Sequence, residues 1–138
     1  MIAAATAYGR FFETLAPAAL ERLDEVVVPE VRFVDPFNDV VGIDGMRRVL
    51  ARMFADLPDA RFAVTDVAVG AAAYLRWRFT GGRWAIEGVS EVHFAADGRA
   101  SLHVDHWDAA AQLYQRVPVL GMAIRAVRRR VGVFPPAG

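Results

Sequence analysis

The sequence predicts an α+β fold in which helices come first and an antiparallel sheet follows. Two stretches within residues 3–57 place apolar residues at helical spacing, whereas residues 61–107 alternate apolar and polar side chains with a period of two. Three turn signals divide the alternating part into four strands: Gly70-Ala71, Gly81-Gly82 and Asp97-Gly98. A chain of 138 residues is long enough to form one domain with a sizeable core.

Composition argues against several classes of protein. The 16 basic residues, all arginine, balance 16 acidic residues, so the net charge gives no reason to expect nucleic acid as a partner. There is no cysteine, which leaves no disulfide and no thiolate metal site, and we expect no cofactor. The N-terminus lacks the basic and apolar regions of a signal peptide, and no apolar run approaches the roughly 20 residues of a membrane span. We therefore expect a cytoplasmic protein.

Three helices are predicted in the first part of the chain. The first covers residues 3–15, and a short second helix begins at Pro17, which suits a first helical turn and leaves Val27 on the inner side. A third helix follows Asp44, its expected N-cap, and ends at Pro58. Its apolar stripe is the clearest in the sequence: Met46, Val49, Leu50, Met53, Phe54 and Leu57.

The remaining elements are strands and two terminal helices. A short strand over 31–35 ends at Pro36, and residues 37–42 are expected to form a loop. Four further strands are expected near 61–69, 73–80, 83–95 and 99–107, and two helices over 108–116 and 118–131.

The turn signals also predict which face of the sheet is buried. If both later turns contain two residues, Phe79 lies opposite Trp84, and Trp77 lies opposite Ile86. One face then collects Leu75, Trp77, Phe79, Trp84, Ile86, Val92 and Phe94. The other face pairs Arg76 with Glu87 and carries Arg78, Arg83, Glu91, His93 and His106. The apolar face is expected to be the buried one.

The buried face carries polar side chains from the strand near 99–107. The same register places His103 opposite Val92, Asp105 opposite Ser90 and Trp107 opposite Gly88, which has no side chain and leaves room. Because an isolated charge is costly to bury, these groups need partners or a wet cavity. An apolar cavity with a few convergent polar groups is typical of a small-ligand site.

The order of elements and two motifs resemble the nuclear transport factor 2-like superfamily. The motifs are Phe33-Val-Asp-Pro-Phe-Asn-Asp-Val-Val-Gly42, and Asp97-Gly98 followed by His103-Val-Asp-His-Trp-Asp108. Steroid delta-isomerase, limonene epoxide hydrolase and polyketide-cyclase-like proteins belong to this group. The resemblance covers about residues 3–110. It implies a cone-shaped domain in which a strongly curved, mostly antiparallel sheet wraps around the N-terminal helices, often as a dimer through the outer sheet face.

The resemblance also implies roles for particular residues. Asp35 is similar to the general base of the isomerase, whose oxyanion-hole tyrosine falls on Phe11 and whose second acid falls near Ser90. Tyr8, one helical turn before Phe11, is the substitute donor. Asp105 resembles one aspartate of the epoxide hydrolase. The arginine and second aspartate of that enzyme should come from the strand Leu75-Arg-Trp-Arg-Phe79, which offers only Leu75, Trp77 and Phe79 to the pocket.

Each candidate has a structural alternative beside its catalytic role. Asp105 is a proton carrier or an aspartate bonded to Ser90; Asp35 is a base or a turn former before proline. His103 assists Asp105 through a water or the ligand, or is a hydrogen-bonded core histidine. The other residues expected to contact a small apolar ligand are Tyr8, Phe37, Asn38, Trp77, Ser90 and Trp107.

These observations predict an acid–base enzyme of the isomerase, hydratase or cyclase type, or else a binding or dimerisation module without chemistry. No metal is expected, because His106 points away from His103 and Asp105. We expect a homodimer. The C-terminal segment, about 108–131, is expected to be a lid or docking segment. For residues 117–131 the alternative is contact with an anionic membrane surface.

Overall fold

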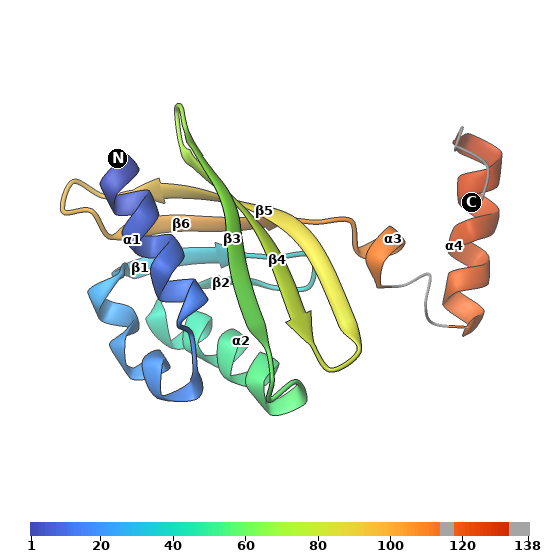
Figure 1. Ribbon diagram of the computed structural model, residues 1–138, viewed down its shortest axis with the longest axis horizontal. Helices are drawn as coiled ribbons and strands as arrows, with labels where there is room; N and C mark the ends of the chain where they lie inside the picture. Colours follow the sequence, from blue (N-terminus) through green and yellow to red (C-terminus); the bar gives the residue numbers. More distant parts are fainter. Residues whose placement is uncertain (114–117, 133–138) are drawn as a thin grey trace. The chain divides into compact units, whose positions relative to one another are not determined.

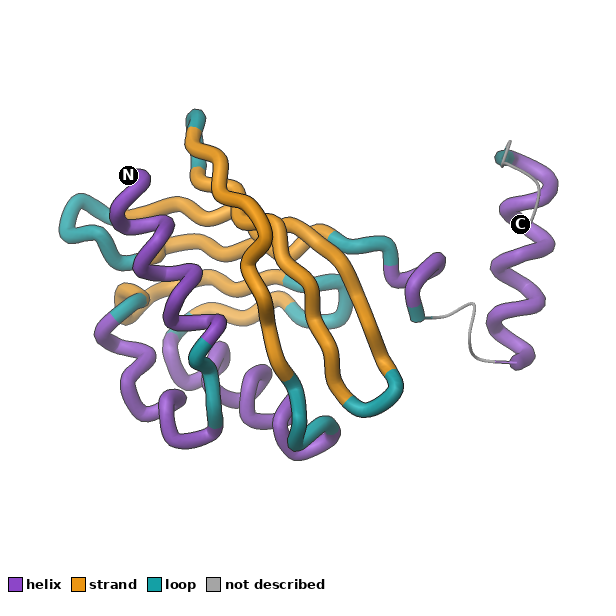
Figure 2. Tube along the Cα trace, in the orientation of Figure 1, coloured by secondary structure: helices purple, strands orange, loops and turns teal. Residues whose placement is uncertain are grey.

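Three helices lie against one curved sheet in the first part of the chain (Figures 1 and 2). They are α1 (Ile2–Glu13), the 3₁₀ helix η1 (Pro17–Glu25) and α2 (Ile43–Asp56). The structure, a computed structural model, describes residues 1–113 and 118–132. The chain divides into two units, Met1–Trp107 and Asp108–Gly138.

The sheet has six strands in the order β2-β1-β6-β5-β4-β3. Strands β1 and β6 pair in parallel, and every other neighbouring pair is antiparallel. The predicted α+β class with a mostly antiparallel sheet is thus confirmed. The last strand, β6, lies between β1 and β5 inside the sheet. The bounds are β1 (Val27–Val34), β2 (Asp39–Val41), β3 (Arg61–Val69), β4 (Ala73–Gly81), β5 (Trp84–Phe94) and β6 (Ala100–His106).

Three predictions in the N-terminal half were wrong. Strand β1 begins at Val27, which was expected on a helix, and the expected loop contains β2. The three residues of β2 are too few to show a period, and they are held by pairing with β1 from Arg32↔Val41 to Val34↔Asp39. Gly42, with a φ of 95°, precedes α2 as its N-cap, so Asp44 lies in the first turn instead.

The first predicted hairpin register is shifted by two residues. Gly81 pairs with Trp84, so the turn is Gly82-Arg83, and the φ of 55° at Gly82 suits glycine. A shift of two keeps every side chain on its face, and Trp77 is buried as predicted. On the outer face, however, Glu87 pairs with Arg78 (2.9 Å) rather than with Arg76.

In the second hairpin the pairs near the site are as predicted. Val92 lies opposite His103, and Ser90 lies opposite Asp105. Phe94 pairs with Ala100 instead of Ser101, because the register shifts between residues 93 and 94. This bulge leaves Phe94 half-buried, whereas Val92 is fully buried.

Gly88 was expected to lie opposite Trp107 and to leave open space, but Trp77 occupies that space. Gly88 and Trp77 are directly paired between β4 and β5. A Cβ atom on Gly88 would lie 2.5 Å from Cζ2 and 2.6 Å from Cη2 of Trp77. The space left by the missing side chain is therefore filled by the indole ring.

Helix α1 packs across β3 and β4, and α2 packs on β1, β2 and η1. The close approach of α1 occurs at Gly9, where a Cβ would lie 3.2 Å from Leu75 Cδ2. The Val64 backbone N–H donates a hydrogen bond to Glu13 Oε2 (3.3 Å), which joins α1 to the edge strand β3. These contacts direct Tyr8 and Phe12 toward the inner face of the sheet.

The second unit contains α3 (Ala109–Gln112) and α4 (Pro118–Val131). The Asp108 carboxylate caps α3 by accepting from the Ala111 N–H (2.9 Å), and the end of the expected helix over 108–116 lies outside the described residues. Helix α4 agrees with the predicted 118–131. Its role as a lid or docking segment stays a prediction. Over the described residues, the helices fall short of the length and apolarity needed to cross a membrane.

The contact between Gly88 and Trp77 predicts the effect of adding one methyl group. We expect Gly88→Ala to displace the indole and lower the free energy of unfolding by about 1–3 kcal/mol, as overpacking does. Urea denaturation measures this change. The matched control is Gly70→Ala, because a Cβ at Gly70 meets nothing within 4 Å. Equal stabilities for the two variants would contradict the proposed contact.

Candidate functional site

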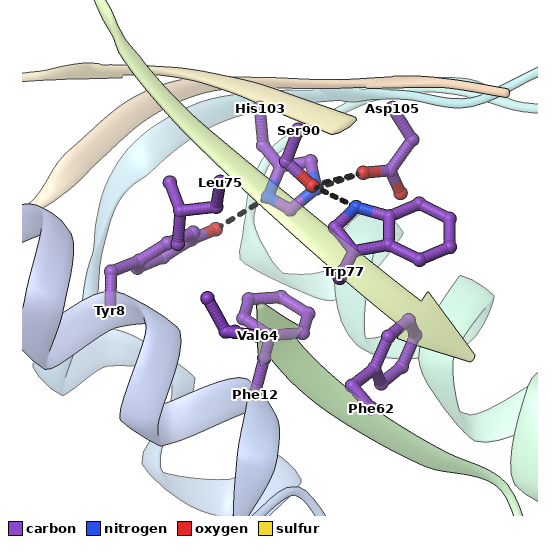
Figure 3. Close-up of a pocket in the computed structure, with 9 residues that line it drawn as sticks. All are labelled: Tyr8, Phe12, Phe62, Val64, Leu75, Trp77, Ser90, His103 and Asp105. Carbon is purple, nitrogen blue, oxygen red and sulfur yellow. Dashed lines mark hydrogen bonds and ion pairs between the residues drawn. The ribbon is translucent and has the colours of Figure 1, made fainter. Parts of the chain in front are cut away.

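A small cavity lies between α1 and the inner face of the sheet (Figure 3). Its free volume is about 20 Å³, which is room for roughly one water molecule. Four of its nine lining residues have no polar side-chain group: Phe12, Phe62, Val64 and Leu75. The ring of Trp77 adds a fifth apolar surface. The polar members are Tyr8, Ser90, His103 and Asp105, together with the indole N–H of Trp77.

The polar groups form one continuous chain of hydrogen bonds. The Tyr8 hydroxyl lies 2.8 Å from His103 Nδ1, and His103 Nε2 lies 2.7 Å from Asp105 Oδ1. On the other side of Asp105, the Ser90 hydroxyl donates to the same Oδ1 (2.5 Å). The Trp77 Nε1–H then donates to Ser90 Oγ (2.9 Å). Residues from α1, β4, β5 and β6 are thus joined by hydrogen bonds, and His103 and Ser90 bond directly to the same carboxylate oxygen.

When Asp105 is ionised, the hydrogen-bond partners of each group show where the protons lie. A carboxylate only accepts, so Nε2 of His103 carries the proton that points to Asp105. Nδ1 of the neutral imidazole is then an acceptor, and the Tyr8 hydroxyl donates to it. All donors therefore point along the chain toward Asp105.

Solvent exposure differs between Tyr8 and Asp105, the two residues that bond to His103. The Tyr8 side is closed, with a residue exposure of 2%, whereas the Asp105 side chain is 15% exposed. Burial, and secondarily the negative charge of Asp105, raise the pKa of Tyr8 well above its usual value of 10.0. The Tyr8 hydroxyl thus remains a neutral donor throughout the physiological range.

Aromatic rings enclose the imidazole from several elements. The ring centroid of His103 lies 4.8 Å from Phe33 on β1 and 5.3 Å from Phe12 on α1. Its side chain is only 3% exposed. Both ring nitrogens are hydrogen-bonded, so the imidazole is held in one orientation.

The spacing of His103 and Asp105 places both side chains on the inner face of β6. We expected a water or ligand to be needed between them, and this was wrong because the side chains lean together to a direct 2.7 Å contact. Tyr8 comes from α1, which is 95 positions away in the sequence. Only the packing of α1 on the sheet brings it to His103.

Asp35 does not line the cavity. Its Oδ1 accepts from the backbone N–H groups of Phe37 and Asn38 (both 2.7 Å) and from Asn38 Nδ2 (3.1 Å). The carboxylate therefore shapes the loop after β1, which corresponds to the structural alternative for this residue. Asn38 is part of the same loop.

Two other expected ligand contacts also lie outside the cavity. The ring centroids of Phe37 and Trp107 are 5.7 Å apart in an edge-on contact, and Phe37 is 52% exposed. Trp107 lines an open recess with Asp35 at the ends of β1 and β6, and Asp105 lines both this recess and the cavity. The expected pocket residues thus separate into a cavity group (Tyr8, Trp77, Ser90, His103 and Asp105) and a loop group (Asp35, Phe37, Asn38 and Trp107).

Four lining residues were not singled out as site residues from the sequence: Phe12, Phe62, Val64 and Leu75. Phe12 follows Tyr8 by one helical turn, and Phe62 and Val64 alternate along β3. The period of two along β3 was the signal that could have found Phe62 and Val64.

The described residues contain no cluster of three or more histidine, aspartate or glutamate side chains arranged to hold a metal ion.

On the outer face, Glu91 accepts from His93 (3.0 Å) and lies 3.3 Å from His106. These hydrogen bonds, first to His93 and then to His106, lower the pKa of Glu91.

The raised pKa of Tyr8 predicts a loss of stability in alkali. The unfolded chain loses this proton near pH 10, whereas the folded protein retains it. The free energy of unfolding should therefore fall above about pH 10 by up to about 1.4 kcal/mol per pH unit for this group. Urea denaturation between pH 9 and 11.5 measures the slope. Tyr8→Phe should make the slope shallower, and the exposed control Tyr74→Phe should leave it unchanged.

Comparisons with solved structures agree with this fold. TsrD from Streptomyces laurentii has 24% sequence identity and a TM-score of 0.66, and the match covers 86% of this chain and 96% of that one. A SnoaL-like protein from Agrobacterium tumefaciens, provisionally described as an isomerase, has 19% identity and a TM-score of 0.65 over 78% and 96% of the two chains. A protein from Jannaschia sp. CCS1, provisionally described as a SnoaL-like polyketide cyclase, has 20% identity and a TM-score of 0.59 over 67% and 74%.

A search of curated protein sequences finds no match. The family model of the SnoaL-like domain matches residues 8–103, which begin with the Tyr8 of the cavity and end with its His103. That match covers more than half of the chain and spans the helices and strands that form the cavity. The chain therefore belongs to the SnoaL-like domain family, within the nuclear transport factor 2-like superfamily.

Proposed function

We propose that the protein is an acid–base enzyme that moves a proton on a small apolar molecule, in an isomerase-, hydratase- or cyclase-type reaction. The observation that carries the proposal is the direct hydrogen bond between His103 and Asp105 inside an apolar cavity. General acid–base catalysis needs a group that holds a proton close to a site from which water is excluded. The His103–Asp105 pair supplies that group.

The lining of the cavity supports an apolar, uncharged substrate. Its walls are mainly aromatic and aliphatic, and its lining residues include neither arginine nor lysine. A carboxylate or phosphate ligand would meet Asp105 without a compensating cation. The solved structures provisionally described as an isomerase and a polyketide cyclase support the proposed type of reaction.

The small free volume supports a second candidate, a binding module without chemistry. A cavity of about 20 Å³ is far below the roughly 300 Å³ of ordinary ligand pockets. A substrate therefore has to displace part of the wall, for example the half-buried Phe62 and Val64 on the edge strand β3. The two candidates differ in what happens to a proton of the bound molecule.

The proposal predicts proton exchange at carbon. We expect the protein to catalyse deuterium exchange next to the carbonyl of an apolar ketone, with cyclohexanone and acetophenone as probes, followed by NMR in D₂O. Asp105→Asn retains the shape and an acceptor oxygen but removes the negative charge beside His103. It should slow exchange about a hundredfold or more and change the free energy of unfolding by less than about 1 kcal/mol.

Asp35→Asn is the matched control. It should leave the exchange rate unchanged, because Asp35 accepts loop hydrogen bonds and does not line the cavity. Binding of the ketones without catalysed exchange would favour the binding module. A loss of stability of about 1–3 kcal/mol in Asp105→Asn would indicate a structural aspartate.

We also propose a homodimer through the outer sheet face. On this face Tyr74 is 40% exposed, Leu102 and Val104 are half-buried, and Arg78 and Glu87 form an ion pair. A stable interface needs more than about 1,000 Å² of buried surface, which a sheet face can supply. Light scattering should give the mass of two chains, and a monomer at high micromolar concentration would contradict the proposal.

A further inference from the structure

We propose that the Tyr8 hydroxyl is the end of the hydrogen-bond chain that exchanges a proton with the bound molecule, with His103 as the base behind it and Asp105 as its charge partner. This inference rests on the proposed function. It gives Tyr8 the direct contact with the substrate, while His103 and Asp105 act on the substrate by way of Tyr8.

The imidazole itself has no free nitrogen to offer a substrate. Nδ1 is occupied by the Tyr8 hydroxyl at 2.8 Å and Nε2 by Asp105 Oδ1 at 2.7 Å. Phe12 and Phe33 lie against the ring, and the side chain is 3% exposed. A proton can therefore reach His103 only through one of its two partners. Within the described residues, Tyr8 and Asp105 are the titratable groups that hydrogen-bond to this ring.

Tyr8 is suited to pass a proton to Nδ1. Its single proton already points to that nitrogen, and its oxygen keeps lone pairs for a second bond on the cavity side. Asp105 lies on the other nitrogen, which already carries a proton in the neutral imidazole, so a proton from Asp105 would find no vacant position there.

The transfer is a two-proton relay. A C–H or O–H bond of the substrate breaks, its electron pair stays on the substrate, and the proton forms a new bond to the Tyr8 oxygen. The original Tyr8 proton moves to His103 Nδ1, and the resulting imidazolium is paired with the ionised Asp105. Tyr8 is neutral before and after the step and then donates to the newly formed anion. The reverse movement returns the proton.

The electrostatics of the cavity agree with this order. Burial and the charge of Asp105 raise the pKa of Tyr8, so a free tyrosinate is disfavoured, and the relay never forms one. An imidazolium beside a carboxylate at 2.7 Å is a compensated pair. Ser90 donates to the same carboxylate oxygen and holds it in place.

The first test measures the proton positions without any substrate. Long-range ¹H–¹⁵N NMR of the full chain at pH 7 should show His103 protonated on Nε2, with Nδ1 unprotonated and hydrogen-bonded. In Tyr8→Phe the Nδ1 resonance should move toward that of a free imidazole nitrogen, whereas Tyr74→Phe should leave it unchanged. A proton on Nδ1 in the wild type, alone or together with Nε2, would overturn the relay, because the accepting position would already be filled.

The second test uses the ketone exchange reaction. In a relay the residues act as one unit, so Tyr8→Phe and Asp105→Asn should each slow exchange about a hundredfold and the double variant should be no slower than either. Rates in mixtures of H₂O and D₂O should indicate two protons in motion for the wild type. A structural tyrosine would lower stability without changing this isotope dependence.

The outcomes separate the two proposals. If Asp105→Asn abolishes exchange while Tyr8→Phe retains most of it, or if the losses multiply in the double variant, the relay is wrong and the proposed function stands. If the wild type catalyses no exchange with either ketone, the proposed function fails for these probes, and the NMR result still decides whether the protons have the arrangement that the relay requires.

Discussion

The polar part of this structure depends on the hydrogen bond between His103 and Asp105. A carboxylate with 15% exposure and an imidazole with 3% exposure would each be costly to bury alone. Together they satisfy one another, while the Tyr8 hydroxyl donates to Nδ1 of His103 at 2.8 Å and the Ser90 hydroxyl donates to Oδ1 of Asp105 at 2.5 Å. Because a buried polar group without a partner costs free energy, the hydrogen bonds extend from Tyr8 to Trp77 without a break.

The apolar surroundings follow from the same requirement. Aromatic rings from α1, β1 and β3 lie around the polar groups and lower the local dielectric, which strengthens the hydrogen bonds between them. Trp77 contributes in both ways, since its ring forms part of the wall and its Nε1–H donates to Ser90. It can lie there only because Gly88, its neighbour on β5, has no side chain.

The cavity is nearly filled, so catalysis by this domain requires a change in the cavity wall before a substrate can bind. With room for about one water molecule, the described state holds its polar groups ready but does not accommodate a substrate. Binding therefore requires movement of side chains at the wall, and the edge strand β3 has half-buried residues there. His103, Asp105 and Ser90 lie on the central strands β6 and β5, so movement at the edge strand can leave their hydrogen bonds intact.

The sequence by itself determined the fold class, the buried face of the sheet and the placement of His103 and Asp105 on that face. These features follow from a period of two and from glycine turns, which are local, and an error of two residues in the first hairpin did not change the face. The separation of Asp35 from the cavity could not be predicted, because an aspartate before proline fits both a base and a turn. Likewise, only the tertiary structure placed Tyr8 on His103, 95 residues away, and Trp77 over Gly88. Such contacts depend on how a helix crosses a sheet and how side chains lean, and neither is encoded in the periodicity of any one segment.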